Sequence, residues 1–119
     1  MEAGSQHNLK QKLTLLCRLE PGCLGPDGAQ HIEAFCTLAQ QALQSYRADI
    51  AIWQLTPRYD KSLSEMSYRL GDRPLTPAQS DKYLALFNLS LDEFEERFQD
   101  KLTGLITQFL ARHSRNQHS

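Results

Sequence analysis

The sequence predicts an α+β fold with about four helices and a small antiparallel two- or three-stranded β-meander in the middle of the chain. Three observations carry this prediction. Apolar residues recur every three or four positions in both outer parts of the chain, they alternate in the centre, and helix-capping sequences separate the segments. The expected order is α-α-β-β-(β)-α-α, in a single domain over residues 8–113 with frayed ends at residues 1–7 and 114–119.

The first helix is expected between Asn8, a good N-cap residue, and Glu20. Pro21 disfavours helix at the residue before it and would end the segment. Its apolar stripe has three- and four-residue spacing and consists of Leu9, Leu13, Leu16 and Leu19.

The second helix is expected to begin after Asp27 as the N-cap and to run to about Arg47. Its glutamines would face outward. Its buried stripe would consist of Ile32, Phe35, Cys36, Ala39, Leu43 and Tyr46.

The hydrophobic period then changes from helical to alternating. Residues 49–56 read as a strand with both faces largely covered, and residues 66–70 read as a second strand. Gly71-Asp72 is a two-residue hairpin signal, so residues 73–75 are expected to pair as a short third strand. Pro74 confines that strand to an edge of the sheet, because proline has no N–H to donate.

Two capped helices are expected at the C-terminal end. Thr76, Pro77 and Gln79 form a capping box around a first-turn proline, and the helix that they begin would end near residue 88. A second capping box starts at Ser90 and begins a helix to about Arg112. Its buried residues would be Phe94, Phe98, Leu102, Leu105, Ile106 and Phe109. Leu91 and Leu110 widen this apolar arc, so a monomer or a weak homodimer is expected.

Charge and composition narrow the range of functions expected for this chain. The 13 basic and 14 acidic residues give a net charge of -1, which provides no long-range attraction for nucleic acid or anionic lipid. No apolar run approaches the roughly 20 residues that cross a bilayer, and residues 1–8 lack the apolar segment of a secretory signal. The three cysteines are an odd number, unlike most disulfide frameworks. We therefore expect a cytoplasmic protein with no membrane partner.

The cysteines supply one alternative function, a metal or redox protein. Together with His31, they provide the types of ligand that zinc accepts, but no C-x-x-C pair is present. A redox role would fall on Cys23, in a loop, although no resolving cysteine adjoins it. We expect neither a metal nor a cofactor. The three cysteines are Cys17, Cys23 and Cys36.

Three common catalytic motifs are missing from the sequence. It contains no glycine-rich phosphate loop, no H-E-x-x-H and no G-x-S-x-G, so nothing indicates an enzyme. The last two helices have the short connection of a helix-turn-helix. However, the second one begins with Asp92, Glu93, Glu95 and Glu96, which would repel DNA phosphates.

The first hypothesis is therefore a protein-protein interaction module, acting as an adaptor, regulator or subunit. It depends on the loop after residue 56, where aromatic and charged residues of the kind favoured in interfaces gather. The second hypothesis is association with nucleic acid, because a mixture of aromatic and basic residues can stack bases and hold phosphates. The candidate binding residues are Trp53, Arg58, Tyr59, Lys61, Arg69 and Arg73. The competing interpretation is a solvated sheet with its aromatic side in the core.

Overall fold

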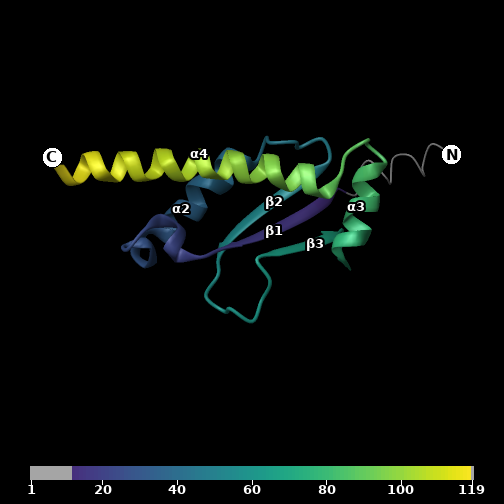
Figure 1. The fold of residues 1–119 in the computed structure, drawn as a ribbon, viewed down its shortest axis with the longest axis horizontal. Coiled ribbons are helices and arrows are strands. Elements are labelled where there is room, and N and C mark those ends of the chain that lie inside the picture. Colours follow the sequence, from purple (N-terminus) through teal and green to yellow (C-terminus); the bar gives the residue numbers. More distant parts are fainter. Residues whose placement is uncertain (1–11, 119) are drawn as a thin grey trace.

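The structure is a computed structural model that describes the backbone of residues 12–118 and the side chains of residues 12–112. Figure 1 shows the arrangement of its elements along the chain. They are β1 (Leu13–Leu19), the 3-10 helix η1 (Pro21–Leu24), α2 (Gly28–Leu43), β2 (Ala51–Pro57), β3 (Met66–Leu70), β4 (Arg73–Leu75), α3 (Pro77–Ala85) and α4 (Leu91–His118).

The four strands form one mixed sheet in the order β2-β1-β3-β4. β1 pairs in parallel with β2 on one side and antiparallel with β3 on the other, and β3 forms a hairpin with β4. The expected antiparallel meander of two or three strands is therefore wrong. So is the expected number of helices, since residues 12–118 contain three α-helices and one short 3-10 helix.

Both errors have one cause, because the segment predicted as the first helix is the central strand of the sheet. In β1 the residues Leu13, Leu15, Cys17 and Leu19 are all buried and share one face. Leu16 lies on the other face, yet it also fits a helical stripe, so the apolar spacing satisfies both periods. The polar residues Thr14 and Arg18 alternate with these four apolar residues, so Leu16 is the one position of β1 that breaks the strand pattern. The part of the prediction before residue 12 lies outside the described residues.

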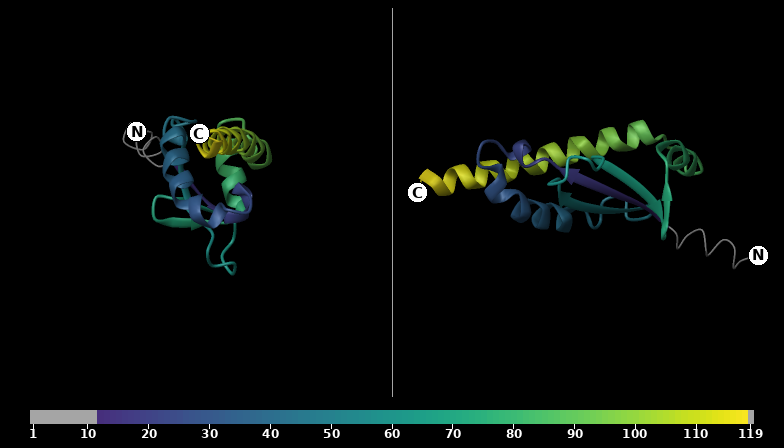
Figure 2. Two further views of the ribbon diagram at one scale, coloured as in Figure 1. Left: turned by 90° about the vertical axis from the view of Figure 1, so that its left-hand side faces the viewer. Right: turned by 90° about the horizontal axis from the view of Figure 1, so that it is seen from below.

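The helices α2 and α4 cover one face of the sheet, so the domain has two layers (Figure 2, left). Trp53 of β2 is the centre of the core. Its ring stacks on Phe98 of α4 with 4.5 Å between centroids and on Phe94 with 5.4 Å. The two helices meet through Phe35 and Phe109, whose rings are in edge contact at 5.4 Å. Burial of these large aromatic rings holds the layers together.

The opposite face of the sheet has no second layer among the described residues, and we call it the open face. The prediction that both faces of β2 are largely covered is therefore wrong, because Ile52 on the open face is 45% exposed. Strand alternation places these residues on the open face: Thr14, Leu16, Arg18, Ile52, Gln54, Thr56, Ser67, Arg69 and Pro74.

The other elements agree with the sequence more closely. α2 forms as predicted but ends at Leu43, and a turn with Arg47 in the left-handed region (φ 48°) leads into β2. β3, the hairpin and the short edge strand with Pro74 are confirmed. The capping box at Thr76 is present in full. Ser90 caps α4 by accepting from the N–H of Glu93, and α4 continues beyond its predicted end to His118.

Candidate protein-binding surface

Trp53, the largest of the predicted binding residues, lies in the core. It is 3% exposed, and its indole N–H donates to the backbone oxygen of Tyr46 at 2.8 Å. Tyr68 is buried on the same side of the sheet. The aromatic side of this sheet is therefore its packed side, as the competing interpretation of the sequence expected.

Arg58 is an anchor for the loop that connects β2 to β3. Its side chain forms an ion pair with Glu20 at 2.5 Å and is 18% exposed. It also donates to the backbone oxygens of Leu63 and Lys61, each at 3.0 Å. Charge-assisted hydrogen bonds to three separate groups fix the course of the loop, so little of this side chain is available to a partner.

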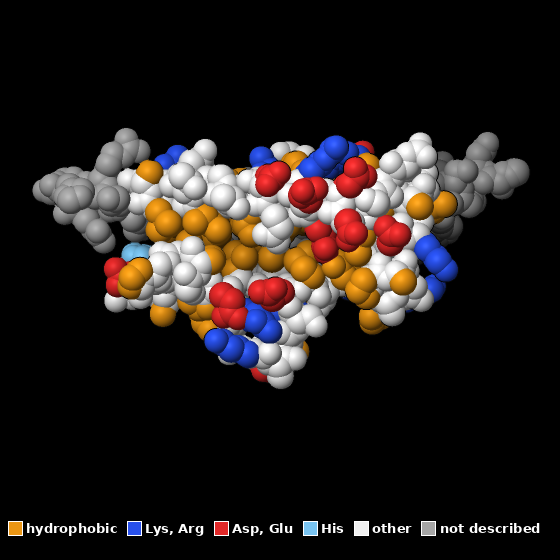
Figure 3. All heavy atoms as spheres, viewed as in Figure 1, with side chains coloured by type: hydrophobic (Ala, Val, Ile, Leu, Met, Phe, Trp, Pro, Cys, Tyr) orange, Lys and Arg blue, Asp and Glu red, His pale blue; other side chains and the backbone are white. Residues whose placement is uncertain are grey.

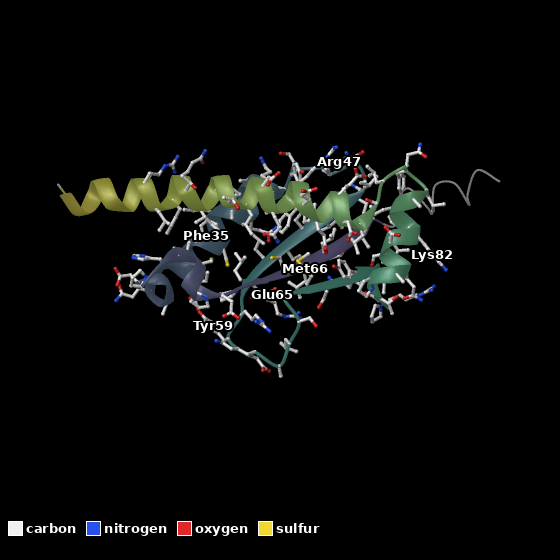
Figure 4. The ribbon with its side chains drawn as sticks, viewed as in Figure 1. Phe35, Arg47, Tyr59, Glu65, Met66 and Lys82 are labelled. Carbon is white, nitrogen blue, oxygen red and sulfur yellow. The ribbon has the colours of Figure 1, made fainter. Side chains whose placement is uncertain are left out.

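The remaining candidates are accessible but do not form one patch. Tyr59 is 63% exposed, and its hydroxyl donates to the Glu33 carboxylate of α2 at 2.9 Å, a bond that raises the pKa of Tyr59. Figure 4 shows it on the loop below the sheet, on the side of α2. Lys61 is exposed in the same loop. Arg69 is half-buried on the open face and Arg73 is exposed on β4, away from this loop.

The outer edge of β2 has properties that the sequence did not reveal. The N–H of Leu13 donates to the oxygen of Ile50, and the N–H of Arg58 donates to the oxygen of Leu19. In a parallel pair these bonds alternate along the strand, so the backbone N–H and C=O groups of the even-numbered residues of β2 point toward β1. The backbone groups of residues 51, 53, 55 and 57 therefore point away from the sheet.

Gln40 of α2 reaches this edge and forms two hydrogen bonds with it. Its side-chain nitrogen donates to the oxygen of Trp53 at 2.6 Å, and its side-chain oxygen accepts from the N–H of Leu55 at 2.9 Å. The N–H of Ala51 is used in the preceding turn by the oxygen of Arg47, and Pro57 has no N–H. The edge is thus partly satisfied without a neighbouring strand, a common protection against uncontrolled strand pairing.

Two hollows lie along this edge, of about 600 Å³ and about 590 Å³. Gln40, Leu55 and Thr56 line both of them, so together they follow the length of β2. We call this space the edge groove. One wall is a polar stripe of α2 at helical spacing, formed by Glu33, Thr37, Gln40 and Gln44. The other wall is β2 itself, with Ile52 at the transition to the open face.

Sequence reasoning missed both Gln40 and Ile52 as site residues. Gln40 reads as one more outward-facing glutamine of an amphipathic helix, and Ile52 reads as a core residue of a strand. Their roles depend on β2 being an edge strand, and that follows from β1 occupying the centre of the sheet. No local pattern around either residue contains this information.

A separate hollow of about 530 Å³ with polar and apolar lining lies between α4 and the end of β1, where Figure 3 shows a band of hydrophobic atoms under the helix. It contains Cys17 and Cys23. Burial raises the pKa of the Cys17 thiol to about 12, that of Cys36 to about 11, and that of Cys23 above its usual value. Reactive cysteines have a lowered pKa, so these shifts count against the redox alternative. Among the described residues, no group of three or more metal-binding side chains comes together.

The nucleic-acid alternative also loses support. A sheet that binds single-stranded RNA presents aromatic rings on its exposed face. Here Trp53 and Tyr68 point into the core, and no aromatic residue in the described strands lies on the open face. Two residues of the open face, Arg18 and Arg69, are basic, and two basic residues alone are weak support for nucleic-acid binding.

The comparisons with known proteins add no functional information. A scan against protein-family models, a search of curated proteins and a search of solved structures each gave no match. Within residues 12–118, no helix is both long enough and apolar enough to cross a membrane.

Proposed function

We propose that this chain is a small protein-protein interaction module that works in the cytoplasm, and that its partner binds at the β2 edge and the adjoining open face. The observation that carries the proposal is the edge groove. It follows a strand whose outward backbone groups are satisfied only in part, two of them by the side chain of Gln40, and it adjoins the exposed apolar residue Ile52.

The chemistry of the groove suits a protein ligand. Its walls supply amide and hydroxyl groups, with the exposed ring of Tyr59 at the end where β2 stops. Such a combination of an apolar contact, an exposed tyrosine and polar groups is typical of interface surfaces. Tyr59 and Lys61 remain candidate contacts from the sequence, whereas Trp53 and Arg58 support the surface from within.

The test is an affinity pull-down of the tagged full chain from lysate, with nuclease treatment and identification by mass spectrometry. Ile52→Glu places a charge on the open face beside the groove and should remove a genuine partner. Leu38→Glu is the matched control, because Leu38 is also a half-exposed apolar residue (50%) but lies on α2 outside the groove. Both variants are first checked for native folding.

The expected result is a partner in near-stoichiometric amount that survives nuclease treatment, is retained by Leu38→Glu and is lost by Ile52→Glu. Retention of every partner by Ile52→Glu would reject the surface. Loss of all partners after nuclease treatment would favour association with nucleic acid instead.

A further inference from the structure

The two hydrogen bonds of Gln40 reproduce those of a neighbouring strand. In a parallel pair, a residue opposite residue j of the neighbouring strand forms two backbone hydrogen bonds. Its N–H donates to the carbonyl of residue j−1, and its carbonyl accepts from the N–H of residue j+1. Gln40 donates to Trp53 and accepts from Leu55, so its amide imitates the backbone of one residue opposite Gln54. An antiparallel neighbour would need two different residues to form the same pair of bonds.

We infer that the edge groove receives an extended peptide segment as a fifth, parallel strand, and that this segment displaces the Gln40 side chain from the β2 backbone. The inference depends on the proposed function, because it names the kind of partner that binds at the same surface. Strand addition of this type draws its affinity from backbone hydrogen bonds and its specificity from alternate side chains.

Space and position support a strand at this edge. The two hollows together extend along β2 from Ala51 to Pro57, and α2 forms one of their walls. At the other edge of the sheet, β4 has only three residues and contains Pro74, which cannot donate a hydrogen bond. β2 is therefore the edge suited to accept a partner strand.

The walls define the side chains of the segment. On one side, the segment would face the polar stripe of α2, which favours serine or threonine at those positions. On the other side, its residue opposite Ile52 would extend the open face and favours an apolar group. Cross-strand pairs of this kind stabilise a sheet.

Charge gives the direction. Lys12 lines the groove where β2 begins, and Glu33 lines it where β2 ends. These are the only charged residues among the described lining of the two hollows. A parallel segment complementary to them has an acidic residue at its start and a basic residue at its end.

The experiment titrates the isotope-labelled full chain with the acetylated and amidated peptide Asp-Ile-Thr-Ser-Thr-Val-Lys, followed by NMR. Its central serine is placed opposite Gln54, and its isoleucine opposite Ile52. The expected result is a shift of the Leu55 backbone amide and the Gln40 side-chain amide, with the latter moving toward its position in an unfolded chain.

Two controls test the hydrogen bonds and the direction. N-methylation of the central serine removes the donor to Trp53 and should weaken binding about tenfold, the equivalent of about 1.4 kcal/mol. The reversed peptide, Lys-Val-Thr-Ser-Thr-Ile-Asp, places the charges wrongly in a parallel strand and should also bind more weakly.

Gln40→Ala removes the competing side chain and should tighten binding about tenfold, provided that circular dichroism shows a native fold.

Several outcomes would overturn the inference. They are no shift at about 1 mM peptide in either protein, equal binding of the N-methylated peptide, shifts confined to another surface, or self-association of Gln40→Ala in place of peptide binding. The last outcome would show that Gln40 protects the edge against a second copy of the chain. If the peptide fails but the lysate partner still depends on Ile52, only strand addition is rejected. If that partner is missing as well, the proposed function fails with it.

Discussion

The contact between Gln40 and the edge of β2 allows a quantitative prediction for folding. Gln40→Ala removes two hydrogen bonds, of 2.6 Å and 2.9 Å, to the backbone of Trp53 and Leu55. A hydrogen bond contributes about 0.5–1.5 kcal/mol net to stability, so two contribute about 1–3 kcal/mol. Water in the adjacent groove can replace part of this loss, and alanine is the better helix former. The free energy of unfolding should therefore fall by about 1–2 kcal/mol.

Urea denaturation followed by tryptophan fluorescence measures this change, because the chain has one tryptophan and it lies in the core. Gln41→Ala is the matched control. Gln41 is the next residue of the same helix and is exposed, so its replacement should change the stability by less than about 0.5 kcal/mol. Equal stability of the two variants would refute the role given to Gln40.

Hydrogen exchange locates the effect within the strand. In Gln40→Ala the amide of Leu55 should exchange faster, because it has lost its acceptor. The amide of Gln54 faces β1 and should keep its protection relative to the rest of the sheet. An equal increase at both positions would indicate general destabilisation rather than the loss of one edge contact.

The remaining predictions concern the core. Gly28→Ala should destabilise strongly and lower the thermal midpoint, because a Cβ at residue 28 would lie 1.7 Å from the backbone oxygen of Pro21; an unchanged midpoint would contradict the close approach of α2 to η1. Trp53→Ala should cost about 3–5 kcal/mol in urea denaturation followed by circular dichroism, since it empties the space between the sheet and α4. Alkylation of the native protein should modify Cys23 first and leave Cys17 protected until unfolding, because Cys23 is exposed and Cys17 is buried; mass spectrometry that finds Cys17 modified equally early would contradict this packing.

The raised pKa of Cys17 also predicts how stability depends on pH. In the unfolded chain this thiol ionises near its usual value of 9.0, whereas in the folded chain its pKa is about 12 because of burial. Its contribution to stability is therefore complete below pH 9 and is lost as the pH rises toward 12. Denaturation curves at several alkaline pH values should show the decline, and Cys17→Ala should make it less steep. Parallel curves for the two proteins would argue against the burial of this thiol.

Local sequence determined the helices and strands whose sequence patterns lie within a single segment of the chain. The capping box at Thr76 and Gln79, the stripe of α2 and the alternation of residues 66–70 each contain their own evidence, and all were confirmed. Net charge and the lack of catalytic motifs gave the expectation of a binding protein, which stays a prediction. The helix expected before Pro21 failed because its leucine spacing fits a helix and a strand equally well.

Only the tertiary structure decided the candidate surface. Pairing of β1 with both β2 and β3 places β1 in the centre and leaves β2 as an edge. That single choice buries Trp53 under α4, exposes Ile52 and brings Gln40 to the outward backbone of β2. The physical reason is that strand order depends on contacts between residues far apart in the sequence, such as Leu13 with Ala51 (38 residues apart) and Leu13 with Leu70 (57 residues apart). Patterns within one segment do not record which neighbour it will have.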